Sequence, residues 1–368
     1  MKKEVKEVVQ WAVFTASFVA TIELASRVDQ WLTYGAPILG VYTYDSALFT
    51  SDEYGIRGKP NGHYEKWILN SSGFRGDDVT LEKPASSLRV VCIGASETFG
   101  FYEQPGNEWP HQLEQALLHR QIQGEVINGA IAGMSLPQRI QHLKNRLLPF
   151  KPDVVIFMLE YGSYAGLTSE RIEARERAPM ALPVQHDMVD GVKSLRVMSR
   201  LKDVVLPKLP MPIQELVGNM KRRLQIRTIK QELGPAYRSF QQVQPFERQA
   251  LERDLETLRN LAETAGVRLI LVSPAMWFTE RNLADIVISW PYLDESWWRE
   301  AGTVLPLVAK AFARQHDVFY IDLSETMRGS EEIYMRDFLH FSDRGAKLVA
   351  DVIVEQVTAK PSFSGMIP

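Results

Sequence analysis

The chain has 368 residues, of which 45% are hydrophobic and 24% charged, and its formal net charge is -3. This is the composition of an ordinary globular protein; it excludes the basic excess of a nucleic-acid-binding protein and the bias of a disordered chain. The single cysteine, Cys92, excludes a disulfide framework and a cysteine-based metal site. The length is compatible with one large domain that carries additional segments.

An apolar stretch without charges covers residues 8–22, between Glu7 and Glu23. A spanning helix needs roughly 20 apolar residues, so this stretch can cross a membrane only if flanking polar side chains snorkel to the interface. Three lysines precede it and only Arg27 follows closely, which favours a cytoplasmic N-terminus and an exported body. No small-x-small cleavage site follows, so residues 1–30 are predicted to form an uncleaved membrane anchor; a removed signal peptide and a helix packed on the body are the alternatives.

Residues 31–88 are predicted to form an irregular lead-in, because turn-forming residues interrupt every apolar segment there. Short β-branched runs then alternate with amphipathic helical stretches. The runs cover residues 88–93, 125–127, 153–159, 267–272 and 318–321, and the helical stretches cover 109–119, 137–148, 246–265 and 297–315. Strands that are apolar throughout and alternate with helices predict an α/β fold, a three-layer sandwich around a five-stranded parallel sheet.

The main domain is predicted to cover residues 89–359, with one interruption. Between residues 167 and 237, Arg- and Glu-rich helix-like pieces are broken by prolines, which indicates a helical insertion that serves as a lid or a docking element. Residues 360–368 are predicted to be a loose tail. Ligands of such folds bind at the carboxyl ends of the strands, so catalytic residues are expected in the loops that follow the strands.

A serine follows the first of these strands. Gly94-Ala95-Ser96 places its hydroxyl where the chain enters a helix at the carboxyl edge of the sheet. The free backbone N–H groups of a helix start can stabilise developing negative charge there. Ser96 could equally be only the N-cap of that helix, and the motif alone does not separate the two interpretations.

Two other segments carry residues suited to catalysis. After the second strand, Gly133 offers a flexible backbone N–H to an oxyanion, or it only satisfies a turn. Near the C-terminus, Asp337 and His340 have a three-residue spacing that allows the acid to fix the tautomer of the imidazole. The simpler alternative is that Asp337 caps a turn and His340 is a half-buried polar residue.

The order of these motifs resembles the SGNH (GDSL-like) hydrolase family. The preceding segment, Asn70-Ser71-Ser72-Gly73-Phe74-Arg75-Gly76, looks like the one before the catalytic block in membrane-anchored bacterial members of that family. The matching blocks are the GxS motif that ends at Ser96, an NxxxxG motif that ends at Gly133 and a DxxHxxxxG motif that begins at Asp337. The Trp109-Pro110 opening of the first long helix matches as well. The resemblance covers residues 70 to about 358, apart from the insertion, and implies an SGNH/flavodoxin-like fold.

The resemblance also implies the roles of individual residues. Ser96 would be the nucleophile, His340 the general base and acid, and Asp337 the residue that orients His340. The backbone N–H groups of Ser96 and Gly133 would form part of the oxyanion hole. Neither a cofactor nor a metal ion is implied.

One block departs from the family pattern. The GxND block after the third strand corresponds to Gly162-Ser163-Tyr164-Ala165, so Tyr164 replaces the asparagine that donates to the oxyanion. Losing one such donor costs about 2.7 to 4 kcal/mol. The Tyr164 phenol or the Ser163 hydroxyl could donate instead, or Tyr164 could only line the pocket; both interpretations stay open.

Three functions are compatible with these features. The first is a serine esterase that removes O-acyl groups, acetyl above all, from a cell-surface glycan or lipid. It would be a single-pass protein of the inner (cytoplasmic) membrane with its catalytic domain on the periplasmic or extracellular side. The second is an O-acyltransferase to a polysaccharide, and the third is a catalytically impaired binding or scaffold protein. The complete Ser, His and Asp set favours the first.

Overall fold

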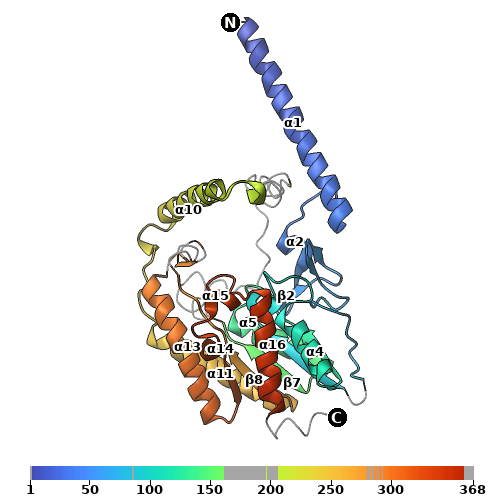
Figure 1. Cartoon of the computed structure of the whole chain (residues 1–368), viewed down its shortest axis with the longest axis vertical. Helices are drawn as coiled ribbons and strands as arrows, with labels where there is room; N and C mark the ends of the chain where they lie inside the picture. Colours follow the sequence, from blue (N-terminus) through green and yellow to red (C-terminus); the bar gives the residue numbers. More distant parts are fainter. Residues whose placement is uncertain are drawn as a thin grey trace.

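The computed structural model describes residues 2–84, 87–160, 196, 206–279, 282, 283, 286, 288, 290, 291 and 293–359. A five-stranded parallel sheet occupies the centre of the body. Its strands are β5 (Leu88–Ile93), β6 (Gly124–Asn128), β7 (Val154–Met158), β8 (Arg268–Ser273) and β9 (Phe319–Asp322). Their order in space is β6-β5-β7-β8-β9, so the chain reverses direction across the sheet between β5 and β7 (Figure 1). Ligands of such sheets bind at this switch point.

Helices cover both faces of the sheet. One layer contains α4 (Trp109–His119) and α16 (Asp343–Thr358), and the other contains α5 (Leu136–His142), α11 (Pro245–Ala265) and α13 (Glu295–Gln315). Alternate residues of β5 enter the two cores: Val90 packs with the first layer and Val91 with the second. The predicted fold class, a three-layer α/β sandwich around a five-stranded parallel sheet, is therefore confirmed.

The predicted helices agree with the observed ones, with one difference. The stretch predicted as a helix over 137–148 is α-helical only to His142; it continues as the π-helix η1 (Leu143–Leu147) and the 3-10 helix η2 (Leu148–Phe150). Pro149 lacks a backbone N–H and cannot extend the regular hydrogen-bond pattern. Two further short helices, α14 (Leu323–Met327) and α15 (Glu331–Tyr334), follow β9.

The lead-in contains more regular structure than the sequence predicted. It holds the short helix α2 (Tyr44–Leu48) and two antiparallel hairpins. The hairpins are β1 (Phe49–Asp52) with β2 (Gly55–Gly58), and β3 (His63–Tyr64) with β4 (Trp67–Ile68). These strands have two to four residues, too short to produce a hydrophobic alternation in the sequence.

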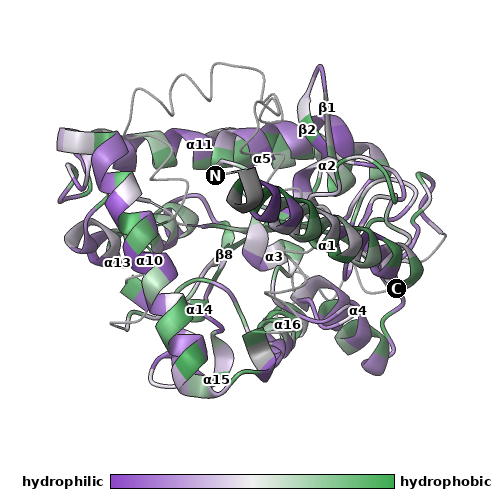
Figure 2. Ribbon diagram, turned by 90° about the horizontal axis from the view of Figure 1, so that it is seen from above, coloured by the Kyte–Doolittle hydropathy of each residue, from purple (hydrophilic) through white to green (hydrophobic). Residues whose placement is uncertain are grey.

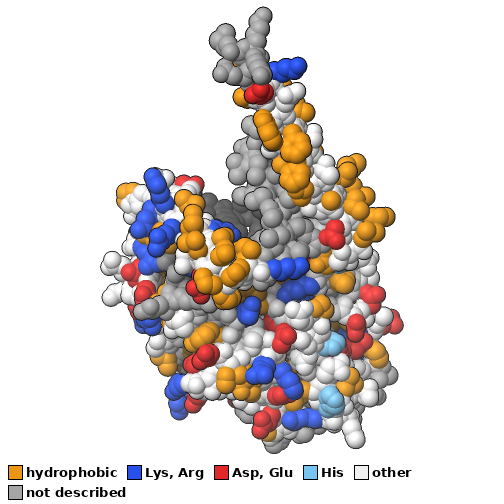
Figure 3. Space-filling model, turned by 45° about the horizontal axis from the view of Figure 1, so that its top comes forward, with side chains coloured by type: hydrophobic (Ala, Val, Ile, Leu, Met, Phe, Trp, Pro, Cys, Tyr) orange, Lys and Arg blue, Asp and Glu red, His pale blue; other side chains and the backbone are white. Residues whose placement is uncertain are grey.

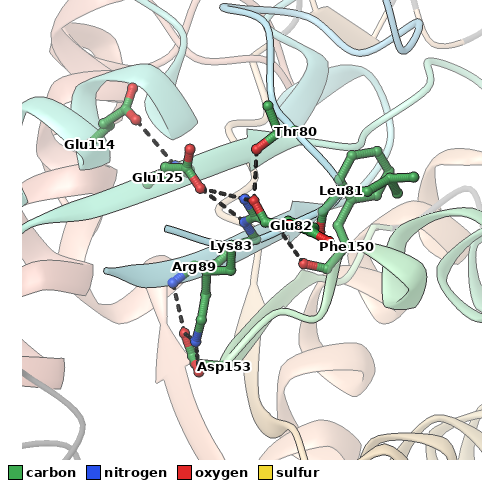
Figure 4. Close-up of polar contacts among 10 residues, drawn as sticks. Thr80, Leu81, Glu82, Lys83, Arg89, Glu114, Glu125, Phe150 and Asp153 are labelled. Atoms are coloured by element: carbon green, nitrogen blue, oxygen red, sulfur yellow. Dashed lines mark hydrogen bonds and ion pairs between the residues drawn. The ribbon is translucent and has the colours of Figure 1, made fainter. Parts of the chain in front are cut away.

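A polar network fastens the end of the lead-in to the amino edge of the sheet (Figure 4). The Arg89 side chain is completely buried and donates to Glu125 at 2.6 Å and to the Phe150 carbonyl at 2.7 Å. Lys83 pairs with Asp153 at 2.6 Å. Hydrogen bonds to a buried guanidinium need fixed geometry, so this network defines where the chain enters β5.

The N-terminal helix α1 (Lys2–Tyr34) projects away from the body (Figure 1). Its 33 residues correspond to a length of about 50 Å, more than a bilayer core requires. The segment Val5–Tyr34 is long and apolar enough to cross a membrane, although a signal sequence passes the same test. Within this helix, Glu23 and Arg27 form an ion pair at 2.6 Å, so each charge is compensated inside the helix.

The predicted insertion is only partly within the described residues. Residues 161–195 and 197–205 lie outside them, as does the predicted tail, residues 360–368. The described part contains η4 (Leu206–Lys208), the helix α10 (Met211–Leu233) and η5 (Gly234–Ala236). Figure 2, a view from above, shows α10 on the same side of the body as α1.

Candidate active site

Ser96 is the first residue of the short helix α3 (Ser96–Phe99), directly after β5 at the carboxyl edge of the sheet. Its side chain is partly exposed, whereas Glu97, Thr98 and Phe99 are buried. The tight turn requires glycine at position 94, because a Cβ there would lie 2.0 Å from the Thr98 Oγ1. The GxS motif is therefore explained by the turn that presents the serine.

Asp337 and His340 lie in the loop between α15 and α16. The Asp337 Oδ1 accepts the backbone N–H groups of Leu339 and His340, both at 2.8 Å, which folds the loop around the carboxylate. The same carboxylate holds the imidazole, with Oδ2 2.9 Å from the His340 Nδ1. The three-residue spacing thus produces a local acid–imidazole pair.

The loop brings His340 to the serine. The His340 Nε2 lies 2.8 Å from the Ser96 Oγ, although 244 residues separate them along the chain. The rings of Phe101 and Tyr102 pack beside the imidazole at centroid distances of 5.8 and 5.1 Å. Ser96, His340 and Asp337 are therefore connected by hydrogen bonds in the order needed for base-assisted attack by a serine.

The surroundings shift the pKa values of this pair in opposite directions. Burial lowers the pKa of His340, but the hydrogen bond and charge of Asp337, with the nearby carboxyls of Glu97 and Glu103, outweigh it and leave the pKa raised. Burial raises the pKa of Asp337, but its hydrogen bonds with the His340 ring and with the loop N–H groups leave it lowered. Both shifts favour an imidazolium beside a carboxylate.

Two buried carboxyl groups near Ser96 and His340 were not predicted from the sequence. Glu97 is 1% exposed, and its Oε2 lies 3.5 Å from the Ser96 Oγ. Glu103 is also 1% exposed and accepts the Tyr102 N–H at 3.0 Å. Burial raises the pKa of both side chains to about 7. An acidic residue directly after Ser96 was the available signal, but a surface position is the usual expectation for glutamate.

A buried ion pair lies next to Glu97. The Arg139 guanidinium is completely buried and donates to Glu160 and to the Met158 carbonyl, both at 2.9 Å. The charges of Glu160 and Arg139 act on Glu97 in opposite directions: Glu160 raises its pKa and Arg139 lowers it. Glu160 follows β7, so the carboxyl end of this strand carries a charge beside the catalytic turn.

Arg75, from the lead-in, fixes the other end of the catalytic turn. Its guanidinium donates to the carbonyls of Phe99, at 2.7 Å, and Gly100, and it faces the buried Glu108 carboxylate at 3.3 Å. The Asn128 side chain donates to the Thr98 carbonyl at 3.1 Å. The carbonyl groups at the end of α3 are therefore satisfied by two long-range partners rather than by solvent.

The structure describes only some of the predicted oxyanion-hole residues. Gly133 is exposed and has a φ of 80°, a conformation that favours glycine. Its N–H donates to no acceptor in the part of the chain that the structure describes. Tyr164 lies outside the described residues. Among the described residues, no group of three or more His, Cys, Asp or Glu could hold a metal ion.

Comparisons with known proteins give similarity to solved structures only. No family model matches the chain, and neither does any curated protein. A lipase/acylhydrolase from Enterococcus faecalis is 16% identical with a TM-score of 0.44, covering 74% of this chain and 98% of its own. A GDSL-like lipase from Bacteroides thetaiotaomicron is 11% identical with a TM-score of 0.41, covering 76% and 91%. An acetyl xylan esterase is 13% identical with a TM-score of 0.43, covering 73% and 100%.

The similar solved structures thus include a GDSL-like lipase and other ester hydrolases. At TM-scores between 0.41 and 0.44, however, the similarity carries no argument about activity or substrate.

Proposed function

We propose that the protein is an SGNH-type serine esterase. The observation that carries this proposal is the pair of hydrogen-bond distances at His340: 2.8 Å from Nε2 to the Ser96 Oγ and 2.9 Å from Nδ1 to the Asp337 Oδ2. A serine needs an adjacent base to become a nucleophile, and the base needs a partner that fixes its tautomer. Ser96 at the topological switch point of the sheet has both.

In the proposed reaction, the Ser96 Oγ attacks the carbonyl carbon of an ester while His340 Nε2 accepts the hydroxyl proton. Asp337 keeps the proton on Nδ1 and stabilises the imidazolium. The backbone N–H groups of Ser96 and Gly133 donate to the oxyanion of the tetrahedral intermediate. His340 then returns the proton to the leaving alcohol, and a water molecule, activated by the same imidazole, releases the acid from Ser96.

The proposed substrate is an O-acyl ester, above all an acetyl ester, on a glycan or lipid at the cell surface. This part of the proposal rests on α1, which has the length and composition of a membrane span and leads directly into the body. With the lysine-rich N-terminus in the cytoplasm, the catalytic domain would face the periplasm or the exterior of the inner membrane. A membrane-tethered enzyme meets substrates that are themselves fixed near the membrane.

The proposal is tested with the full-length protein in detergent, using p-nitrophenyl acetate and a fluorophosphonate probe. We expect hydrolysis, and covalent labelling that peptide mapping assigns to Ser96; Ser96→Ala should abolish both. Ser330→Ala is the matched control, because Ser330 is a similarly half-buried serine whose side chain makes no cap hydrogen bond.

Two outcomes would change the assignment. A folded protein that neither hydrolyses esters nor accepts the probe would contradict the esterase function and favour a binding role. Faster acyl transfer to an added oligosaccharide than to water would instead identify an O-acyltransferase, since both reactions begin with the same attack by Ser96.

A further inference from the structure

The helix α10 (Met211–Leu233) exposes an apolar stripe to solvent. Five of its residues recur at the spacing i, i+3, i+4, i+7 and i+11, which places them along one face of the helix. They are strongly exposed: Ile213 43%, Leu216 59%, Val217 42%, Met220 57% and Leu224 62%. We call these five residues the α10 stripe. Exposed apolar surface of this continuity indicates an interaction site.

The α10 stripe is the more exposed of two apolar sides of the helix. Ile226, Ile229 and Leu233 form a second apolar set at i, i+3 and i+7, and these three residues are half-buried. The two sets lie on different sides of the helix, because successive residues turn by about 100°. One apolar side of the helix is therefore half-buried, and the other, the α10 stripe, is exposed.

Basic residues border the α10 stripe, and acidic residues do not. Lys221 is next to Val217 and Leu224 at helical spacings of four and three, and Arg223 and Arg227 lie beside Met220 and Leu224. The acidic residues of the helix, Glu215 and Glu232, have no stripe residue three or four positions away. Figure 3 shows hydrophobic and basic side chains together on this lobe of the molecule. Such a face is complementary to a surface that is apolar inside and anionic outside.

The position of α10 relates this face to the N-terminal helix. In Figure 1, α10 lies across the view on the side of the body from which α1 projects, near the level at which α1 joins the body. Figure 2 shows the two helices separated from each other on this same side. A bilayer crossed by α1 would therefore have its surface near α10, and α10 would lie along it rather than through it.

We propose that α10 is an interfacial helix: its stripe inserts into the headgroup region of an anionic bilayer while Lys221, Arg223 and Arg227 contact lipid phosphates. Amphipathic helices with basic residues beside an apolar face bind membranes in this way. The consequence is a second attachment point that fixes how the catalytic domain is oriented above the membrane. This orientation depends on the proposed membrane span of α1. The exposure of the stripe and the charges beside it do not depend on that span.

The test places a fluorescent probe on the stripe. Full-length Leu216→Cys is labelled with the environment-sensitive dye NBD and reconstituted into vesicles of phosphatidylcholine with phosphatidylglycerol. Glu215→Cys, one position away and off the stripe, is the matched control. The native Cys92 is fully buried, and treating the unsubstituted protein with NBD measures any labelling of this cysteine. We expect a blue shift and quenching by doxyl-labelled lipids for position 216, and quenching by aqueous iodide for position 215.

The outcomes separate the membrane from other partners. Iodide quenching of both positions would overturn the proposal. Protection of position 216 from both quenchers would also overturn it, by indicating that the stripe pairs with a second copy of the chain.

A second variant tests the charge argument. Substituting Lys221, Arg223 and Arg227 together by Glu should reduce the doxyl quenching at position 216 at least about tenfold in vesicles with anionic lipid, since each basic residue near such a surface contributes about fivefold to binding. Hydrolysis of p-nitrophenyl acetate should be unchanged, because none of these residues approaches Ser96. Unaltered quenching in this variant would contradict the proposal. If the unsubstituted protein and every variant lack esterase activity, the proposed esterase function is contradicted, and the membrane proposal for α10 is not.

Discussion

The Ser96 hydroxyl has two acceptors within reach, the His340 Nε2 at 2.8 Å and the Glu97 Oε2 at 3.5 Å. The two acceptors have different consequences. A proton that passes to His340 activates the serine, whereas an ionised Glu97 beside the nucleophile would oppose the developing oxyanion. Burial raises the pKa of Glu97 to about 7, so this carboxyl changes its charge in the range where the imidazole also titrates.

Catalysis should depend on pH through the protonation of His340. kcat/KM should rise with pH through a midpoint above the ordinary histidine value, because Asp337 and the nearby carboxyls raise the pKa of His340. Replacing Glu97 by Gln removes one of these negative charges, so the midpoint should move to lower pH. The measurement is kcat/KM for p-nitrophenyl acetate against pH, with the exposed Glu332→Gln as a control that leaves the profile unchanged. A midpoint that stays in place or moves upward in Glu97→Gln would contradict this account.

The same carboxyl should make stability depend on pH. The pKa of Glu97 is raised from an ordinary 4.5 to about 7 in the folded protein, so between these values the folded state binds more protons than the unfolded state. The stabilisation is complete below the ordinary value and is lost as the pH rises through about 7. The free energy of unfolding in urea should therefore decrease less between pH 4.5 and about 7 for Glu97→Gln than for the unsubstituted protein. An identical pH dependence in both proteins would show that Glu97 is not the group responsible.

The hydrogen bond between Asp337 and His340 should control kcat rather than folding. Asp337→Asn preserves the size of the side chain but offers an amide to Nδ1, which selects the wrong imidazole tautomer. We expect kcat to fall by about 10³- to 10⁴-fold. Circular dichroism and thermal unfolding provide the control that the loop is intact. A loss of less than tenfold would show that Asp337 is not the orienting residue.

The buried pair Arg139–Glu160 should contribute to stability only while both partners are present. Arg139→Met leaves the Glu160 carboxylate, 8% exposed, without its guanidinium, and should reduce the free energy of unfolding by about 3 to 5 kcal/mol. The double variant with Glu160→Gln should recover part of the loss, because no buried charge remains. Lys347→Met, which breaks the exposed pair with Asp351, is the control and should have a much smaller effect. A double variant that is less stable than the single one would contradict this explanation.

The secondary structure of the core followed from local patterns. The apolar run that became β5 and the amphipathic stretch that became α4 were predicted with the bounds that the structure has. Hydrophobic periodicity reports such elements because each one buries a strip of side chains along its own length. The hairpins of the lead-in were missed, since strands as short as His63–Tyr64 leave no period to detect.

The sequence alone determined which residue types were available for catalysis: a serine after the first strand, an acid and an imidazole three residues apart, and a glycine after the second strand. It also determined the apolar character of residues 8–22, whereas the length of α1, Lys2–Tyr34, came from the structure. Only the tertiary structure decided that the His340 loop lies 2.8 Å from Ser96 across 244 residues, that Glu97 and Arg139 are buried beside it, and which side of α10 is left uncovered. The reason is physical. Local sequence sets the conformation of a segment, whereas the distance between segments and the burial of a charge depend on how distant helices and strands pack together.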